Sequence, residues 1–190
     1  MKKSIFALLA LVLVLAGQSA FAQKKAYEQG DYILNAGVSL GYYGYGYVGS
    51  RSGGFLPLTA SLEKGIHEHI SVGPYVGYAS WKYKGSGYNY SWNFTSVGVR
   101  GTFHAVSLLN ETLDMSINEN KIDLYGTLMA GLEFRSFSGD EFLEDYANET
   151  NFFVGPVLGA KYKFNDKIGS FIEGGRGAFG YSTLGVSVNF

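Results

Sequence analysis

The sequence predicts an all-β fold: an eight-stranded, antiparallel, up-and-down transmembrane β-barrel. Three observations predict it: an N-terminal export signal, eight segments in which apolar and polar residues alternate, and a second face on these segments that is rich in Gly, Ser and Thr. Alternation with a period of two is typical of a strand whose two faces meet different surroundings. Segments of about ten residues can cross a bilayer as tilted strands.

The chain begins with the export signal. Lys2 and Lys3 precede an unbroken apolar run over residues 5–16, and the motif Ala20-Phe21-Ala22 has the form of a cleavage site. The run is too short to span a membrane as a helix, which disfavours the alternative of an uncleaved anchor. We expect cleavage between Ala22 and Gln23, which gives a signal peptide, 1–22, and one barrel domain, 23–190.

Composition narrows the class of the mature chain. Lys2 and Lys3 lie in the signal, so 13 of the 15 basic residues remain against 16 acidic ones, a net charge of −3. Such a chain lacks the basic face that nucleic-acid binding requires. The absence of Cys excludes disulfides, thiol chemistry and a lipoprotein anchor. The content of 27 Gly, 15 Tyr and 14 Phe with only 3 Pro favours many strands.

The eight alternating segments follow in order along the mature chain. In the fifth, which is the cleanest, Leu124 and Leu128 stand on one face and Asp123 and Thr127 on the other. Small and polar residues suit the interior of an eight-stranded barrel, which side chains just fill. The segments lie at about residues 31–43, 55–64, 69–82, 92–104, 121–135, 151–164, 167–177 and 180–190.

The fourth segment changes phase. Trp92 and Phe94 are apolar at even positions, whereas Val97 and Phe103 are apolar at odd positions. A β-bulge near Thr95 would place all of them on one face, because a bulge adds one residue to a strand. The sequence therefore predicts a bulge there.

Aromatic residues distinguish this chain from a soluble sandwich, whose strands would alternate too. With the N-terminus in the periplasm, they form two belts, as expected at the two interfaces of a membrane. The periplasmic belt would contain Tyr32, Phe103, Tyr162, Phe164 and Phe190, and the outer belt Tyr42, Tyr78, Trp92, Phe94, Phe134 and Phe152.

The connections also fit a barrel, in which outer loops are longer than periplasmic turns. The expected outer connections are 44–54, 83–91, 136–150 and 178–179, and the periplasmic ones are 65–68, 105–120 and 165–166. Segment 105–120 is long for a periplasmic turn. We expect a short helical turn below the barrel there.

The signal, the eight segments and the terminal "GVSVNF" resemble the small outer-membrane β-barrel proteins of the OmpX and OmpA-transmembrane-domain type. The resemblance covers the whole mature chain and implies location in the outer membrane of a Gram-negative-type bacterium. It also implies that Phe190 is the recognition signal for the barrel-assembly machinery. Fold does not determine function, so the resemblance leaves the activity open.

Charged residues on the polar faces would point into the lumen. Eight strands leave no open channel, so a hydrogen-bonded structural plug is the favoured interpretation, and a narrow ion path is the alternative. The lumen set is Glu63, Arg100, Asp123, Glu133, Arg135, Lys161, Lys163 and Glu173.

Histidines provide the only candidates for a metal site. His67 and His69 flank Glu68, and His104 faces His69 if the third and fourth segments pair with residue numbers that sum to about 173. Imidazole and carboxylate together suit zinc. Because H-x-H alone is a weak motif, we favour solvated turn residues and expect neither a metal nor a cofactor.

An enzyme that modifies lipid acyl chains is disfavoured. Such enzymes of the outer membrane place a His and a Ser near the outer leaflet, whereas all three His map to the periplasmic end. A nucleophile needs a general base within hydrogen-bond reach. The outer serines Ser80, Ser86, Ser91 and Ser96 have no such partner.

The outer loops carry the remaining functional signal. "GYGYVG", residues 44–49, has dinucleotide-loop spacing, but another strand follows it rather than the required helix. We interpret its glycines as loop residues. Tyr-, Gly- and Ser-rich loops suit adaptable contacts, and the acidic third loop could attract cations that bridge to lipopolysaccharide. The candidate contact residues are Tyr45, Tyr47, Tyr88, Tyr90, Asp140 and Glu141.

The sequence thus predicts a non-enzymatic outer-membrane protein with a structural or surface-interaction role, such as adhesion. A narrow pore is the first alternative, and a lipid-modifying enzyme is the second. The expected partners are outer-membrane lipids and lipopolysaccharide, the assembly machinery, and an extracellular ligand or surface. Simple solvation and interface anchoring by the loop tyrosines is the plainer interpretation of the loops.

Overall fold

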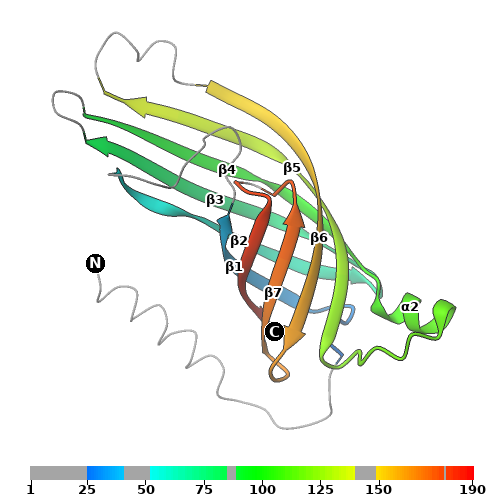
Figure 1. Cartoon of the computed structure of the whole chain (residues 1–190). Helices are drawn as coiled ribbons and strands as arrows, with labels where there is room; N and C mark the ends of the chain where they lie inside the picture. The colour runs from blue at the N-terminus through cyan, green and yellow to red at the C-terminus, as the bar shows by residue number, and fades with distance from the viewer. Residues whose placement is uncertain (1–24, 41–51, 85–88, 140–148, 178) are drawn as a thin grey trace.

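The computed structural model describes residues 25–40, 52–84, 89–139, 149–177 and 179–190. Eight antiparallel strands follow one another around a closed barrel in chain order (Figure 1). The predicted fold class is confirmed. The signal peptide and its cleavage site at Ala22 and Gln23 lie outside the described residues.

The strands and the helix lie close to the segments that the alternation predicts. The single described helix, α2, spans Val106–Leu113, inside the connection expected to hold a helical turn. Within the described ranges, no helix has the length and apolarity to cross a membrane. The strands are β1 (Tyr32–Leu40), β2 (Ser52–His67), β3 (Ile70–Lys84), β4 (Asn89–His104), β5 (Ile122–Ser138), β6 (Glu149–Lys163), β7 (Ile168–Gly175) and β8 (Ser182–Asn189).

Closure comes from pairing of the first strand with the last. Leu34 on β1 is the register partner of Leu62 on β2 and of Val188 on β8. Each strand therefore has a neighbour on both sides, and the ring has no free edge at this level. Closure of this kind is required of any sheet that crosses a membrane, because lipid offers no hydrogen-bond partners.

The outer surface of the barrel is apolar. Leu128, Val99 and Leu158 are 58%, 62% and 75% exposed, although they lie in the middle of their strands. Exposed aromatic side chains mark the two ends of this surface, as in a membrane-spanning barrel. We call the end at which β1 starts the inner end, and its exposed aromatic residues are Tyr32, Phe103, Tyr162, Phe164 and Phe190. Towards the opposite, outer end they are Tyr78, Phe134 and Phe152.

The fourth strand corrects one sequence expectation. β4 pairs with β3 and β5 without any shift of register, so no bulge is present near Thr95. Phe94 is 1% exposed and points into the barrel, and Trp92 packs beside it in part. The expectation was wrong because the outer half of the lumen is itself apolar and accepts aromatic side chains on the inward face.

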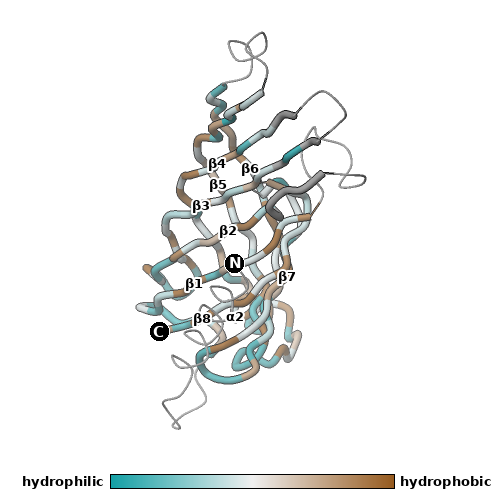
Figure 2. Tube along the Cα trace, turned by 90° about the vertical axis from the view of Figure 1, so that its left-hand side faces the viewer, coloured by the Kyte–Doolittle hydropathy of each residue, from teal (hydrophilic) through white to brown (hydrophobic). Residues whose placement is uncertain are grey.

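The barrel wall is much taller on one side. Strands β2 to β6 have 15 to 17 residues each, whereas β7 and β8 have 8 each. β6 pairs with β7 only from Val157 to Lys163, so its outer half continues beyond β7. Figures 1 and 2 show β4, β5 and β6 extending well past β7 at the outer end.

Glycines face several large rings inside the lumen. A Cβ atom on Gly159 would lie 2.3 Å from the Tyr125 ring, and one on Gly77 would lie 2.3 Å from the Phe179 ring. Because eight strands enclose little space, a large inward side chain needs a neighbour without one. This packing accounts for part of the high glycine content.

The inner end is closed by a segment that the sequence does not reveal. Residues 25–31, which we call the N-terminal strap, precede β1 and fold across the end of the barrel, where Ala26 and Tyr27 are buried. Helix α2 lies at the same end (Figure 1). The helix stops at Asp114, whose φ of 49° is left-handed.

Candidate functional site: the charged lumen and the N-terminal strap

Arg100 forms the centre of the charged lumen. Its Nε lies 3.0 Å from Glu63 Oε1, and its terminal nitrogen lies 2.8 Å from Glu173 Oε1. The three side chains come from β4, β2 and β7, and all are at most 7% exposed. One buried guanidinium thus bridges two carboxylates from opposite parts of the wall.

Hydroxyl and amide groups complete the bonding of this layer. Thr102 donates to Glu63 at 2.6 Å, and Asn35 donates to it at 3.2 Å. Tyr125 donates to Glu173 at 3.0 Å, and Arg100 also donates to Thr127 at 3.2 Å. Buried ions are tolerated when most of their remaining hydrogen-bonding capacity is met. Here both carboxylates accept several hydrogen bonds, whereas Arg100 Nε has an ion-pair contact but no hydrogen bond, and Asn35 Oδ1 has no hydrogen-bond partner. The layer therefore closes the lumen as a structural plug.

A second group of polar side chains lies between this layer and the inner end. His104 Nδ1 is 2.8 Å from Asp123 Oδ2, and His104 Nε2 is 3.0 Å from Ser71 Oγ. Ser71 Oγ is also 3.0 Å from Glu63 Oε2, which joins the two groups. All four residues are at most 5% exposed.

The order Ser71, His104, Asp123 has the spacing of a hydrolytic triad. Two features argue against nucleophilic chemistry. The Ser71 hydroxyl donates its one proton to Glu63, so His104 cannot take that proton as a general base would. The cavity that His104 and Asp123 line has a volume of about 20 Å³, room for about one water molecule. A substrate has no place beside Ser71.

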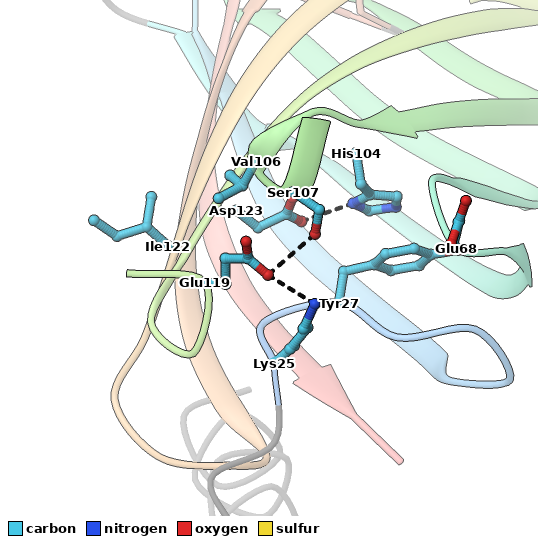
Figure 3. A pocket seen from close by; sticks show the side chains of 9 residues that line it. All are labelled: Lys25, Tyr27, Glu68, His104, Val106, Ser107, Glu119, Ile122 and Asp123. Atoms are coloured by element: carbon cyan, nitrogen blue, oxygen red, sulfur yellow. Dashed lines mark hydrogen bonds and ion pairs between the residues drawn. The ribbon is translucent and has the colours of Figure 1, made fainter. Parts of the chain in front are cut away.

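The strap covers this polar group (Figure 3). The Tyr27 ring is stacked on the His104 ring with centroids 3.5 Å apart and planes inclined by 6°. The Tyr27 hydroxyl lies 2.5 Å from the His67 carbonyl and 2.6 Å from the Ile70 carbonyl. Tyr27 thereby ties the strap to the β2–β3 turn as well as to the lumen.

Ionic and backbone contacts fix the rest of the strap. Lys25 Nζ is 2.8 Å from Glu119 Oε2, and Lys163 Nζ donates to the Lys25 carbonyl at 2.9 Å. Asn189 donates to the Ala26 carbonyl at 3.1 Å. The strap thus contacts β6, β8 and the connection after α2. Figure 3 shows Lys25 and Ser107 meeting at Glu119.

The strap also shifts the titration of its own residues. The hydrogen bond from Lys25 is the largest cause that lowers the pKa of Glu119, and the same bond raises the pKa of Lys25. Burial raises the pKa of the Tyr27 phenol to about 12, and Asp31 adds to the shift. Each shift favours the protonation state found in the docked strap.

Tyr27 makes the docking of the strap sensitive to alkaline pH. Because its folded pKa is raised, its contribution to stability is complete below about pH 10, the ordinary value for tyrosine, and is lost as pH rises through about 12. Protection of strap amides against hydrogen exchange should therefore fall over that window. Tyr27→Phe should flatten the fall. The matched change Tyr162→Phe, on the lipid-facing side, should leave it unaltered, and an equal effect of both would contradict the assignment.

The three histidines do not converge on a metal site. The register of β3 and β4 does sum to 173, and the His104 amide donates to the His69 carbonyl. However, the His104 side chain lies in the lumen, where both ring nitrogens already have partners. The His67 and His69 rings lie 6.0 Å apart at the turn. Among the described residues, no group of three His, Asp or Glu side chains could hold a metal ion.

The remaining four charged residues predicted in the lumen lie at different ends of the barrel. Lys161 is buried, and it is the register partner of Asp123. Lys163 is buried beneath the strap. Glu133 and Arg135 lie apart from them towards the outer end, where Arg135 forms a 3.1 Å ion pair with the half-exposed Glu149.

The outer half of the lumen holds a buried apolar cluster beside Glu133 and Arg135. Tyr75, Met129, Phe153 and Phe179 belong to it and are all less than 8% exposed. Phe179 comes from the β7–β8 connection and packs inward over Gly77. Buried charges thus fill the inner half of the lumen, and buried rings fill most of the outer half.

Most of the predicted loop contacts belong to the outer connections. Tyr45, Tyr47, Tyr88, Asp140 and Glu141 lie outside the described residues. Tyr90 is on β4 opposite Tyr83, and its side chain is not described. Phe190, the expected assembly signal, is 54% exposed at the inner end, and its amide donates to the Tyr32 carbonyl.

Sequence reasoning missed Tyr27, Ser71 and Asp31 as parts of the site. Ser71 and His104 could have been found from constant alternation along β3 and β4, since both stand at inward positions opposite outward Val72 and Phe103. The position of this histidine at the end of its strand instead favours a solvated turn residue. The strap has no comparable signal, because its docking depends on contacts with strands up to 163 residues away.

Comparison with known proteins supplies structures but no sequence relatives. No protein-family model and no curated protein matches the chain. The similar solved structures include Ail, the attachment invasion locus protein of Yersinia pestis, in complex with the heparin analogue sucrose octasulfate. It is 13% identical, covers 85% of this chain and 95% of its own, and has a TM-score of 0.46.

Two outer-membrane proteins of Pseudomonas aeruginosa are similar to the same degree. OprG is 11% identical, with 90% of this chain and 99% of that chain covered and a TM-score of 0.45. The N-terminal β-barrel domain of OprF is 15% identical, with 86% and 98% covered and a TM-score of 0.42. At identities of 11–15%, these are likenesses of fold to a closed eight-stranded barrel.

Proposed function

We propose that this chain is an integral protein of a Gram-negative-type outer membrane with a non-enzymatic role in surface interaction or envelope structure. In this account the barrel is a rigid, closed anchor, and the outer connections make the contacts. The barrel-assembly machinery would recognise its terminal strand, including Phe190. Lipopolysaccharide would surround its outer half.

The unequal height of the wall is the observation that carries this proposal. The outward apolar face of β5 ends at Phe134, but the strand continues to Ser138, and Ser136 on the same face is polar and exposed. β3 likewise continues past Tyr78 to Lys84. These extensions would lift the connections 85–88 and 140–148 beyond the lipid surface. A protein that only sealed a membrane would not need such extensions.

The filled lumen supports a contact role over transport. A cavity beside Arg100 and Glu173 has a volume of about 20 Å³, as does the one beside His104, and each has room for about one water molecule. The rings of Tyr75, Phe94 and Phe179 lie between the charged layer and the outer end. A narrow pore remains the alternative role. An enzymatic role is disfavoured by the proton arrangement at Ser71.

Adhesion of intact cells tests the proposal. The protein would be expressed in a non-adherent Gram-negative host and compared with variants whose residues 44–49 or 140–148 are replaced by Gly-Ser sequences of equal length. We expect attachment to cultured cell layers or to plastic to rise with the protein and to fall in at least one variant. The same replacement of 114–118, at the inner end, is the matched control. Attachment equal to that of cells without the protein would contradict a role in adhesion.

A further inference from the structure

The hydrogen-bonded chain from Glu63 to Asp123 requires more protons than its neutral members supply. It contains three bonds: Glu63 to Ser71 at 3.0 Å, Ser71 to His104 at 3.0 Å, and His104 to Asp123 at 2.8 Å. Each bond needs one hydrogen. Ionised carboxylates supply none, the serine hydroxyl supplies one, and a neutral imidazole supplies one. One hydrogen is therefore missing.

We infer that this chain binds one additional proton in the folded protein, and that His104 carries it as an imidazolium. The site is thus a buried proton-binding site beneath the strap. It is independent of the proposed surface role, because it depends only on contacts inside the barrel.

The surroundings place the proton on His104 and not on either carboxyl group. Glu63 already accepts hydrogen bonds from Thr102 and Asn35 and is paired with Arg100. If its carboxyl group were protonated, the added hydrogen would point at one of these donors and would displace its hydrogen bond. Asp123 is the register partner of Lys161, a cation that favours the ionised carboxylate. With both carboxylates ionised, both ring nitrogens of His104 must donate.

The count of buried charges agrees with this assignment. Among the described buried side chains, four are acids and three are Lys or Arg, so a charged His104 makes the sum neutral. An uncompensated charge in such an interior is costly. The acids are Asp31, Glu63, Asp123 and Glu173, and the bases are Arg100, Lys161 and Lys163.

The additional proton connects the lumen to the strap. The Tyr27 ring is stacked face to face on the His104 ring, where a cationic partner is more strongly attracted than a neutral one. Loss of the proton would remove that attraction and one hydrogen bond and would leave a net buried negative charge. Tyr27 and Asp123 contact His104 directly, and the Tyr125 ring lies 6.1 Å from it. Glu63 is connected to it through Ser71, and Lys161 is the register partner of Asp123. Lys25, Glu68 and Glu119 line the same cavity as His104.

A folded site that holds one proton more than the unfolded chain makes stability fall as pH rises, for as long as that difference in bound protons persists. Docking of the strap should weaken when the site loses its proton.

Nitrogen NMR of a variant with a single histidine tests the inference. His67→Gln with His69→Gln removes the two histidines of the turn and leaves His104 with its network intact. The full mature chain, labelled with ¹⁵N-histidine, would be studied in lipid nanodiscs near pH 7.5. We expect directly bonded protons on both ring nitrogens. A ring nitrogen without a proton at that pH would overturn the inference.

A second measurement uses the strap. In the same variant, hydrogen-exchange protection of residues 26–31 should fall in part over the pH range in which the His104 signal changes to that of a neutral ring, as a step that Tyr27→Phe does not remove. Adding Ser71→Ala removes the connecting hydroxyl, so the His104 change should move to lower pH. Strap protection that is indifferent to the His104 transition would overturn the link between proton and strap.

Discussion

Replacing Arg100 with methionine should lower the free energy of unfolding by about 3–5 kcal/mol, because it leaves Glu63 and Glu173 buried without their common cation. The variant should still insert as a barrel at low temperature. Its transition in urea, followed by tryptophan fluorescence in micelles or vesicles and by the heat-dependent shift in gel mobility, should move to lower denaturant.

Two variants calibrate that result. Arg135→Met breaks an ion pair with the half-exposed Glu149 and should cost about 1 kcal/mol or less. Arg100→Met combined with Glu63→Gln and Glu173→Gln removes the stranded charges and should recover part of the loss. If Arg100→Met were no more damaging than Arg135→Met, the charged layer would not be the structural plug described above.

Arginine at position 128 should cost about 2–4 kcal/mol, because Leu128 lies midway along the outward apolar face of β5. The unfolding transition in lipid vesicles measures the loss. Ser136→Arg is the matched control on the same strand and face. Because Ser136 is the first outward position beyond Phe134, two residues further along the strand, the change should cost about 0–1 kcal/mol, as expected near an interface. Equal costs at the two positions would contradict the depth assigned to the membrane.

The barrel could be predicted from the sequence because its two faces meet very different surroundings. On β5, Leu124 and Leu128 face outward, and Asp123 and Thr127 face the lumen. The polarity of each residue therefore indicates which way its side chain points. The prediction failed on β4, where Phe94 faces inward. There the lumen is as apolar as the exterior, and hydropathy no longer separates the two faces.

The sequence predicted which residues belong to the charged lumen, but not which of them contact one another. Alternation identified Glu63, Arg100 and Glu173 as inward, but their distances depend on the stagger of strands that hydropathy does not fix. Tyr27 carried no signal, because its role comes from stacking on a histidine 77 positions later in the chain. The proton count at His104 likewise needs all three hydrogen-bond partners at once.

The most direct test of a closed, non-transporting anchor is the electrical conductance of the mature chain in a planar bilayer. Insertion would first be established by the heat-dependent gel shift in the same lipid. With the charged layer around Arg100 and the ring cluster around Phe179 both in place, we expect no steady current level above that of the protein-free bilayer. A reproducible single-channel level from the inserted wild-type protein would contradict the closed lumen and favour the pore.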